Sequence, residues 1–101
     1  MDPYVLGAWL GDGSTGKPCI TGVDSEIIEK IESRGYRKSA ECVHAKTGVL
    51  TTYFSGTPGI EWPGRMTREL KDLGIYETKR IPQHYQFLDI EGRYELLAGI
   101  I

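Results

Sequence analysis

Two segments of the chain place their apolar side chains at helical spacing. The first runs from about Ser25 to Arg34 and is stopped by Gly35, and the second runs from Arg65 to Leu73. An apolar residue at every third or fourth position gives a helix one face for the core and leaves the charged residues to solvent. The residues that form the two apolar faces are Ile27, Ile28, Ile31, Met66, Leu70 and Leu73. The pattern therefore predicts two short amphipathic helices.

Apolar runs near both ends of the chain predict two more helices. Asp2 is suited to cap the first of them and Pro3 to begin it, and the apolar run that follows stops at residues 11–13. Asp89 is suited to cap the last helix, which continues to Ile101. Because no capping or turn residue follows, we expect the chain to end within this helix.

Segments rich in β-branched and aromatic residues predict three strands. One strand lies within residues 17–22, and two others, residues 36–45 and 47–55, are expected to form a hairpin around residues 46–48. Residues 56–64 are rich in glycine and proline and are expected to be a loop. Helices and strands in this order predict an α+β fold.

Composition narrows the class of protein. A chain of 101 residues with 40% hydrophobic and 26% charged residues is expected to form one soluble domain, spanning residues 1–101. No window approaches the roughly 18 apolar residues of a membrane span, and the N-terminus does not resemble a secretion signal. Cys19 and Cys42 lack metal-ligand spacing, so a reduced, cytoplasmic protein is expected. The net charge of -2 argues mildly against a nucleic-acid partner.

Glycines on the first and last predicted helices indicate a close helix pair. Gly7 and Gly11 are four residues apart and share one face of the first helix, and Gly99 lies on the last helix. Asp12 follows at the carboxyl end of the first helix, where unpaired carbonyls favour a hard cation. Gly13 is expected to be a left-handed cap. Two such helices side by side would bring two aspartates together, as two-metal phosphodiester hydrolysis requires.

Three blocks of sequence resemble the LAGLIDADG homing endonucleases that are found in inteins. Residues 5–14, Val-Leu-Gly-Ala-Trp-Leu-Gly-Asp-Gly-Ser, resemble the first dodecapeptide motif in its Leu-Gly-x-Trp-Leu-Gly-Asp-Gly form. Residues 95–101, Glu-Leu-Leu-Ala-Gly-Ile-Ile, resemble the opening of the second motif. Residues 66–74, followed by Lys-Arg-Ile-Pro at 79–82 and by Tyr85, resemble the stretch that joins the two motifs in inteins. The resemblance covers the whole chain, with the blocks in the family's order.

The resemblance implies a fold, a reaction and a set of functional residues. Helices would pack behind a curved antiparallel sheet that contacts double-stranded DNA. Asp12 would bind Mg²⁺ as the catalytic residue of the first motif, and Gly7, Gly11 and Gly99 would lie at the helix interface. The parent protein would be a site-specific DNA endonuclease, a hydrolase. The residues expected to contact DNA are Arg37, Lys38, Lys46, Thr51, Tyr53, Lys79 and Arg80.

The sequence departs from the family pattern at its end. In the family the second motif continues beyond the position of Ile101 into an acidic pair and a glycine. We therefore expect this chain to be an N-terminal subdomain that is truncated within the second motif helix and that lacks the partner carboxylate and the C-terminal subdomain. The isolated chain is expected to be inactive. The nucleophile and the His-Asn pair of protein splicing are also absent from the ends of this sequence. Separately, the exposed motif helices predict a homodimer.

Several alternatives remain open at this stage. The same fold serves nuclease-inactive nucleic-acid-binding modules, such as an RNA maturase or a transcription regulator, and an α+β domain with an accidental likeness is a third interpretation. The basic residues Arg34, Arg37, Lys38 and Lys46 would either contact DNA or form a solvated face. Lys79 and Arg80 would either contact phosphates or solvate a connector. The wording of the motifs suggests a bacterial replication or recombination protein as host, for example a replicative helicase.

Overall fold

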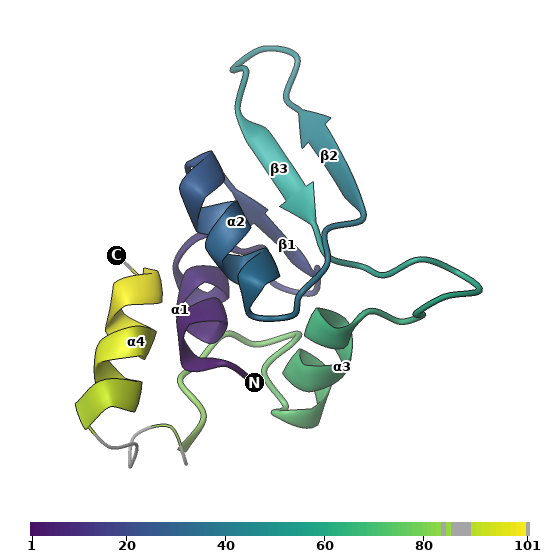
Figure 1. Ribbon diagram of the computed structural model, residues 1–101. Coiled ribbons are helices and arrows are strands. Elements are labelled where there is room, and N and C mark those ends of the chain that lie inside the picture. The colour runs from purple at the N-terminus through teal and green to yellow at the C-terminus, as the bar shows by residue number, and fades with distance from the viewer. Residues whose placement is uncertain (84, 86–89, 101) are drawn as a thin grey trace.

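The fold is α+β, as the order of predicted elements indicated. The computed structural model describes residues 1–83, 85 and 90–100, so Asp89 and Ile101, which the sequence assigned to the last helix, lie outside the described residues. Within the described residues, four helices and three strands follow one another along the chain (Figure 1). They are α1 (Pro3–Asp12), β1 (Cys19–Thr21), α2 (Ser25–Ser33), β2 (Ala40–Val43), β3 (Leu50–Tyr53), α3 (Arg65–Asp72) and α4 (Ile90–Ile100).

The three strands form an antiparallel sheet in the order β1-β3-β2. Ile20 of β1 lies opposite Thr52 of β3, and both side chains are buried, so this face of the sheet belongs to the core. The neighbouring residues alternate to the other face. There Thr21 lies opposite Thr51, and their hydroxyl groups are 2.9 Å apart. The sheet therefore has one packed face and one outer face, and the outer face is covered at the end where buried Cys19 lies opposite Tyr53.

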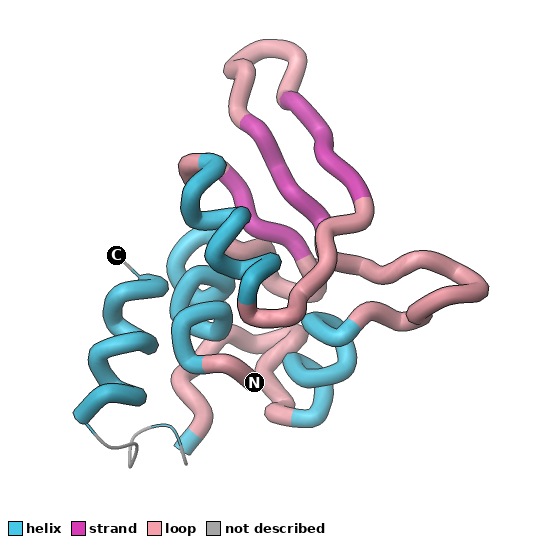
Figure 2. The backbone as a smooth tube through the Cα atoms, in the orientation of Figure 1, coloured by secondary structure: helices cyan, strands magenta, loops and turns pink. Residues whose placement is uncertain are grey.

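The β2–β3 hairpin is shorter than the sequence predicted. Strand pairing ends at Val43 and Leu50, and the connection between them is closed by a hydrogen bond from the Gly48 amide to the His44 carbonyl. All four residues of β2 are exposed, and the hairpin extends away from the helices (Figure 2). Because no second layer covers β2, backbone pairing with β3 is what defines it, and the predicted flanks 36–39 and 44–45 remain outside the strand.

Helix α1 lies at the centre of the molecule, between α4 and the remaining elements (Figure 1). Its residues from Tyr4 to Trp9 are all buried, as is typical of a helix that is apolar on every side. Asp2 caps it as predicted, because its carboxylate accepts hydrogen bonds from the amides of Tyr4 and Val5 at 2.9 and 3.2 Å. Its burial reflects packing within the domain, and no described helix is long and apolar enough to cross a membrane.

Candidate functional site

Helices α1 and α4 lie side by side with their backbones in contact. Gly7 lies against Leu96 and Gly99, and Gly11 lies against Ile100, so both helices run in the same direction. A Cβ atom on Gly11 would lie 2.7 Å from the Ile100 carbonyl oxygen. Real side chains do not make such short contacts, so the glycines set the distance between the two helices. The carboxyl ends of α1 and α4 consequently lie together.

Asp12 is the last residue of α1, and it is exposed at this shared end. The carbonyls of the last helical turn carry partial negative charge, which adds to that of the carboxylate. The Gly13 amide donates a hydrogen bond to the Trp9 carbonyl at 2.8 Å. The Asp12 carboxylate is therefore open to solvent at the carboxyl end of α1.

Gly13 does not adopt the left-handed conformation that the sequence predicted. Its backbone is extended, with φ -84° and ψ 166°, and it pairs with Ile20 in an isolated β-bridge. This pairing leads the chain directly from α1 toward the sheet. A Cβ atom at Gly13 would lie 2.8 Å from Trp9 Cγ, so the close approach to the indole, and not the sign of φ, requires glycine here.

Lys79 reaches the same end of α1 from the connector that follows α3. Its ammonium donates hydrogen bonds to the carbonyls of Gly13 and of Leu10, the latter at 3.3 Å, and it lies 5.2 Å from the centre of the Trp9 ring. Burial lowers the pKa of Lys79, and the negative charge of Asp12 opposes that shift. The sequence interpretation assigned Lys79 either to DNA phosphate or to solvent, and missed this position beside Asp12.

The neighbouring Arg80 is exposed and does not share this site. Only tertiary structure separates the two adjacent basic residues, since both belong to the same Lys-Arg-Ile-Pro block. The sequence did offer one signal for the position of Lys79: the Lys-Arg-Ile-Pro block is one of the three blocks of the resemblance, together with the motif that contains Asp12. Trp9 completes the arrangement, because its indole N–H donates a hydrogen bond to the Lys17 carbonyl at 2.9 Å, which orients the ring under Lys79.

The described residues at this site provide one carboxylate for a divalent cation. Mg²⁺ prefers oxygen ligands, retains several waters and is commonly held by one or two carboxylates together with phosphate oxygens. Asp12 fits one such position. In the described part of the chain, no three His, Cys, Asp or Glu side chains gather closely enough to hold a metal ion. Asp12 therefore fits one ligand position of a divalent-cation site. The other ligands would have to come from outside the described residues.

The residues expected to contact DNA are spread over the outer face and the ends of the sheet. Thr51 and Tyr53 alternate with buried Thr52 and share the outer face of β3. Lys46 lies in the exposed connection of the hairpin, and Arg37 is exposed before β2. Lys38 is also exposed, but its ammonium is paired with Glu41 at 2.9 Å, which offsets its charge.

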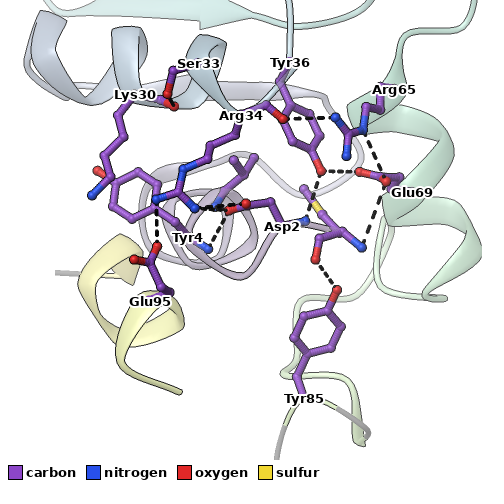
Figure 3. Close-up of polar contacts among 12 residues, drawn as sticks. Asp2, Tyr4, Lys30, Ser33, Arg34, Tyr36, Arg65, Glu69, Tyr85 and Glu95 are labelled. Carbon is purple, nitrogen blue, oxygen red and sulfur yellow. Dashed lines mark hydrogen bonds and ion pairs between the residues drawn. The ribbon is translucent and has the colours of Figure 1, made fainter. Parts of the chain in front are cut away.

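Arg34 belongs to the packing of the helices and not to the hairpin face (Figure 3). Its guanidinium bridges two carboxylates, with Asp2 at 3.0 Å and Glu95 at 2.9 Å. These carboxylates lie at the start of α1 and on α4, so one side chain at the end of α2 connects three helices. The prediction that Arg34 is part of the same basic face as Arg37 is wrong, because its charge is already paired.

A second set of contacts joins α3 to the start of α1 (Figure 3). The Tyr36 hydroxyl donates a hydrogen bond to Glu69 and accepts one from the Asp2 amide at 3.1 Å. Arg65 lies over the Tyr36 ring, 4.3 Å from its centre, and donates to the Arg34 carbonyl at 3.0 Å. Burial, followed by the bond to Glu69, raises the pKa of Tyr36 strongly. These contacts fix the end of α1 opposite to Asp12.

Comparison with known proteins finds a similar segment within a much longer protein. The chain is 33% identical, over all of its 101 residues, to a replicative DNA helicase, DnaB, of Mycobacterium intracellulare. The chain spans only 13% of the length of that relative. No protein-family model matches the chain, and no solved structure matches it.

Proposed function

We propose that this chain is the N-terminal subdomain of a LAGLIDADG homing endonuclease of the intein type. The observation that carries the proposal is the glycine contact between α1 and α4, which places the first motif and the opening of the second motif side by side. Two aspartates at the carboxyl ends of such a pair would lie close together. Asp12 supplies the first of them, and the second would follow α4 in the parent protein.

The similarity to a replicative helicase supports an intein context. The motif wording suggested a replication protein as host, and the relative is a replicative DNA helicase that is far longer than the matched segment. We propose that the matched segment is part of an inserted element and not of the helicase machinery. Reading the parent gene on both sides of this segment tests the proposal: splicing residues at the borders are expected, and uninterrupted helicase sequence would contradict it.

The proposed reaction is Mg²⁺-dependent hydrolysis of a DNA phosphodiester. Asp12 would hold the cation together with the carboxylate of the second motif, and a bound divalent cation supplies an acidified water and neutralises charge on phosphate oxygens. Lys79 would place a positive charge beside the phosphate, because the carbonyls of Leu10 and Gly13 hold its ammonium at this end of α1. The glycines would keep both halves of the site at a constant separation.

The duplex would lie along the outer face of the sheet. Thr51 and Tyr53 present hydroxyl groups on this face, and the major groove is where such side chains distinguish bases. Arg37, Lys46 and Arg80 would contact phosphates, which carry no sequence information but set the position of the protein. Part of the acidic charge lies on α2, at Glu26, Glu29 and Glu32, and the charges of Glu29 and Glu32 act on Lys38. Arg37, Lys46 and Arg80 would therefore carry most of the phosphate contact.

The missing C-terminal subdomain would cover the outer side of α4. Tyr94 and Leu97 are 75% and 57% exposed there, although the opposite side of α4 is packed on α1. Large apolar side chains on one helix face indicate an interface. In the isolated chain, a second copy would occupy this face. The proposed homodimer would thus use the outer side of α4, because the glycine face is already filled within the chain.

A cleavage assay on the parent protein tests the proposed function. The substrate is a plasmid that carries the uninterrupted host gene, incubated with Mg²⁺ or with a chelator. Specific double-strand cleavage is expected with Mg²⁺ and is expected to be lost in Asp12→Asn. Specific binding by the unmodified parent without cleavage would overturn the nuclease proposal in favour of a maturase or regulator. The 101-residue chain alone is expected not to cleave efficiently.

A further inference from the structure

An open cleft lies between α3, the loop at residues 56–64 and the start of the sheet. Its volume is about 370 Å³, and its lining includes Trp62 and Tyr76 as aromatic walls and Lys71, Thr67 and Ser55 as polar groups. The loop that carries Trp62 projects from the body of the molecule beside α3 (Figure 2). The Asp12 site does not include any of these residues.

The aromatic walls of the cleft differ sharply from the aromatic core. Trp62 is 63% exposed, whereas the other tryptophan, Trp9, is completely buried. Tyr76 is half-buried, and its side chain lines the cleft together with Thr67. Two aromatic side chains that line one cleft suit a flat aromatic ligand, because stacking on them removes apolar surface from water.

The polar side of the cleft carries a positive charge. The Lys71 ammonium lies 5.4 Å from the centre of the Tyr76 ring, and Lys71 takes part in none of the ion pairs found between described residues. Ser55 and Thr67, which both carry a hydroxyl, also line the cleft. An ammonium with nearby hydroxyls suits a phosphate, and its position on the Tyr76 ring places that phosphate next to an aromatic surface.

The cleft continues the outer face of the sheet. Ser55 lies two residues beyond Tyr53, the last residue of β3, and alternation along the chain puts it in one row with Thr51 and Tyr53. The Ser55 and Ser39 hydroxyls are 2.9 Å apart, so the two chain segments stay together beyond the strand ends. A nucleic acid on the outer face of β3 would therefore reach the cleft.

We infer that the cleft of Trp62, Tyr76 and Lys71 binds a single unstacked nucleotide, with the base between the aromatic side chains and the phosphate on Lys71. The inference rests on the proposed function, because a nucleic acid on the outer face is what brings a nucleotide here. The cleft would not distinguish base pairs. It would bind the strand through stacking on the aromatic side chains and through the charge of Lys71.

Proton–nitrogen NMR of the two indole N–H groups tests this inference on the chain as it is. Adenosine monophosphate is the probe, titrated at low salt, with adenosine and inorganic phosphate as comparison ligands. The Trp62 resonance is expected to shift to saturation with the nucleotide, while that of buried Trp9 stays in place. Adenosine is expected to bind about tenfold more weakly, because it lacks the charge that Lys71 contacts. A nucleotide titration without a Trp62 shift would overturn the inference.

Two substitutions in the cleft, each with a control elsewhere, separate specific binding from a general effect of the change. Lys71→Gln is expected to weaken the nucleotide about tenfold and to remove its advantage over adenosine, whereas Lys30→Gln on α2, which loses the same charge, is expected to change neither. Trp62→Ala is expected to abolish binding, followed through the Thr67 amide, and Ile60→Ala on the same loop to preserve it. An unchanged preference in Lys71→Gln, or an equal response to inorganic phosphate alone, contradicts the proposed contacts.

Binding of duplex DNA, measured separately by gel shift, keeps this inference distinct from the proposed function. Nucleotide binding in the cleft without duplex binding would leave the cleft in place and count against the endonuclease proposal. Duplex binding without a shift of the Trp62 resonance would overturn the inference about the cleft and leave the endonuclease proposal in place.

Discussion

The ammonium of Lys79 lies beside Asp12 at the carboxyl end of α1, although the two residues are far apart in the sequence. Burial lowers the pKa of Lys79 and Asp12 opposes the shift, so the lysine responds to the charge of the aspartate. Asp12→Asn removes this opposing effect and is expected to lower the pKa of Lys79 further. NMR titration of the lysine side chains measures it, with Lys30 as the internal reference. An unchanged Lys79 pKa would show that the two charges do not interact.

Gly99→Ala is expected to destabilise the fold even though alanine favours helices by about 1 kcal/mol over glycine. The added methyl group would meet the Tyr4 carbonyl and lie 2.7 Å from the Ala8 nitrogen, so α4 has to move away from α1. Overpacking of this kind costs about 1–3 kcal/mol. Urea unfolding measures the loss, and Ala98→Ser on the exposed side of α4 is the control. Equal stability of Gly99→Ala and the wild type would show that the helices separate at no cost.

Tyr36 predicts how stability changes at alkaline pH. Its pKa is raised above the usual 10.0 by burial and by its bond to Glu69, so the unfolded chain loses this proton at a lower pH than the folded chain. The contribution to stability is complete below pH 10 and declines as the pH rises beyond it. Tyr36→Phe is expected to cost about 1 kcal/mol at pH 7, from the lost hydrogen bonds, and to show a flatter decline above pH 10. Urea unfolding at neutral and alkaline pH compares them, and parallel pH curves would contradict this explanation.

The outer side of α4 predicts self-association of the isolated chain. Leu97 is 57% exposed, and Leu97→Glu is expected to shift the chain toward monomer in sedimentation equilibrium because a charge opposes burial of this face. Ile60→Glu places the same charge on the exposed loop at residues 56–64 and is expected to leave the mass unchanged. A monomeric wild type at high concentration would contradict the proposed dimer.

The exposed basic residues predict salt-dependent binding of duplex DNA. Arg37→Gln and Lys46→Gln are each expected to weaken binding and to reduce the slope of log affinity against log salt by about 1, which is the release of one phosphate counterion. Lys38→Gln is expected to have a smaller effect, because Lys38 is paired with Glu41. Gel shifts at several salt concentrations measure the slopes. If all three variants keep the slope of the wild type, the phosphate contacts lie elsewhere.

Local patterns were enough to predict most elements of the fold. Helix α1 begins directly after its N-cap Asp2, and α2 and α3 lie where apolar residues recur at helical spacing. Caps and apolar spacing both depend on neighbouring residues alone. Hairpin pairing was also predicted, but its length was not. Residues of β2 have no covering layer, so their strand propensity does not extend the pairing.

The sequence by itself determined the helices, the hairpin and the residue types of the site, because periodicity, caps and glycine spacing act over a few residues. Tertiary structure alone decided which charges meet. It turned Lys79 toward Asp12 and left Arg80 in solvent, and it placed Arg34 between Asp2 and Glu95. It also made Gly13 extended, because pairing with Ile20 outweighs the local preference for a left-handed cap. Neighbouring residues allow several conformations and charge partners at these positions, and contacts between residues far apart in the sequence select one of them.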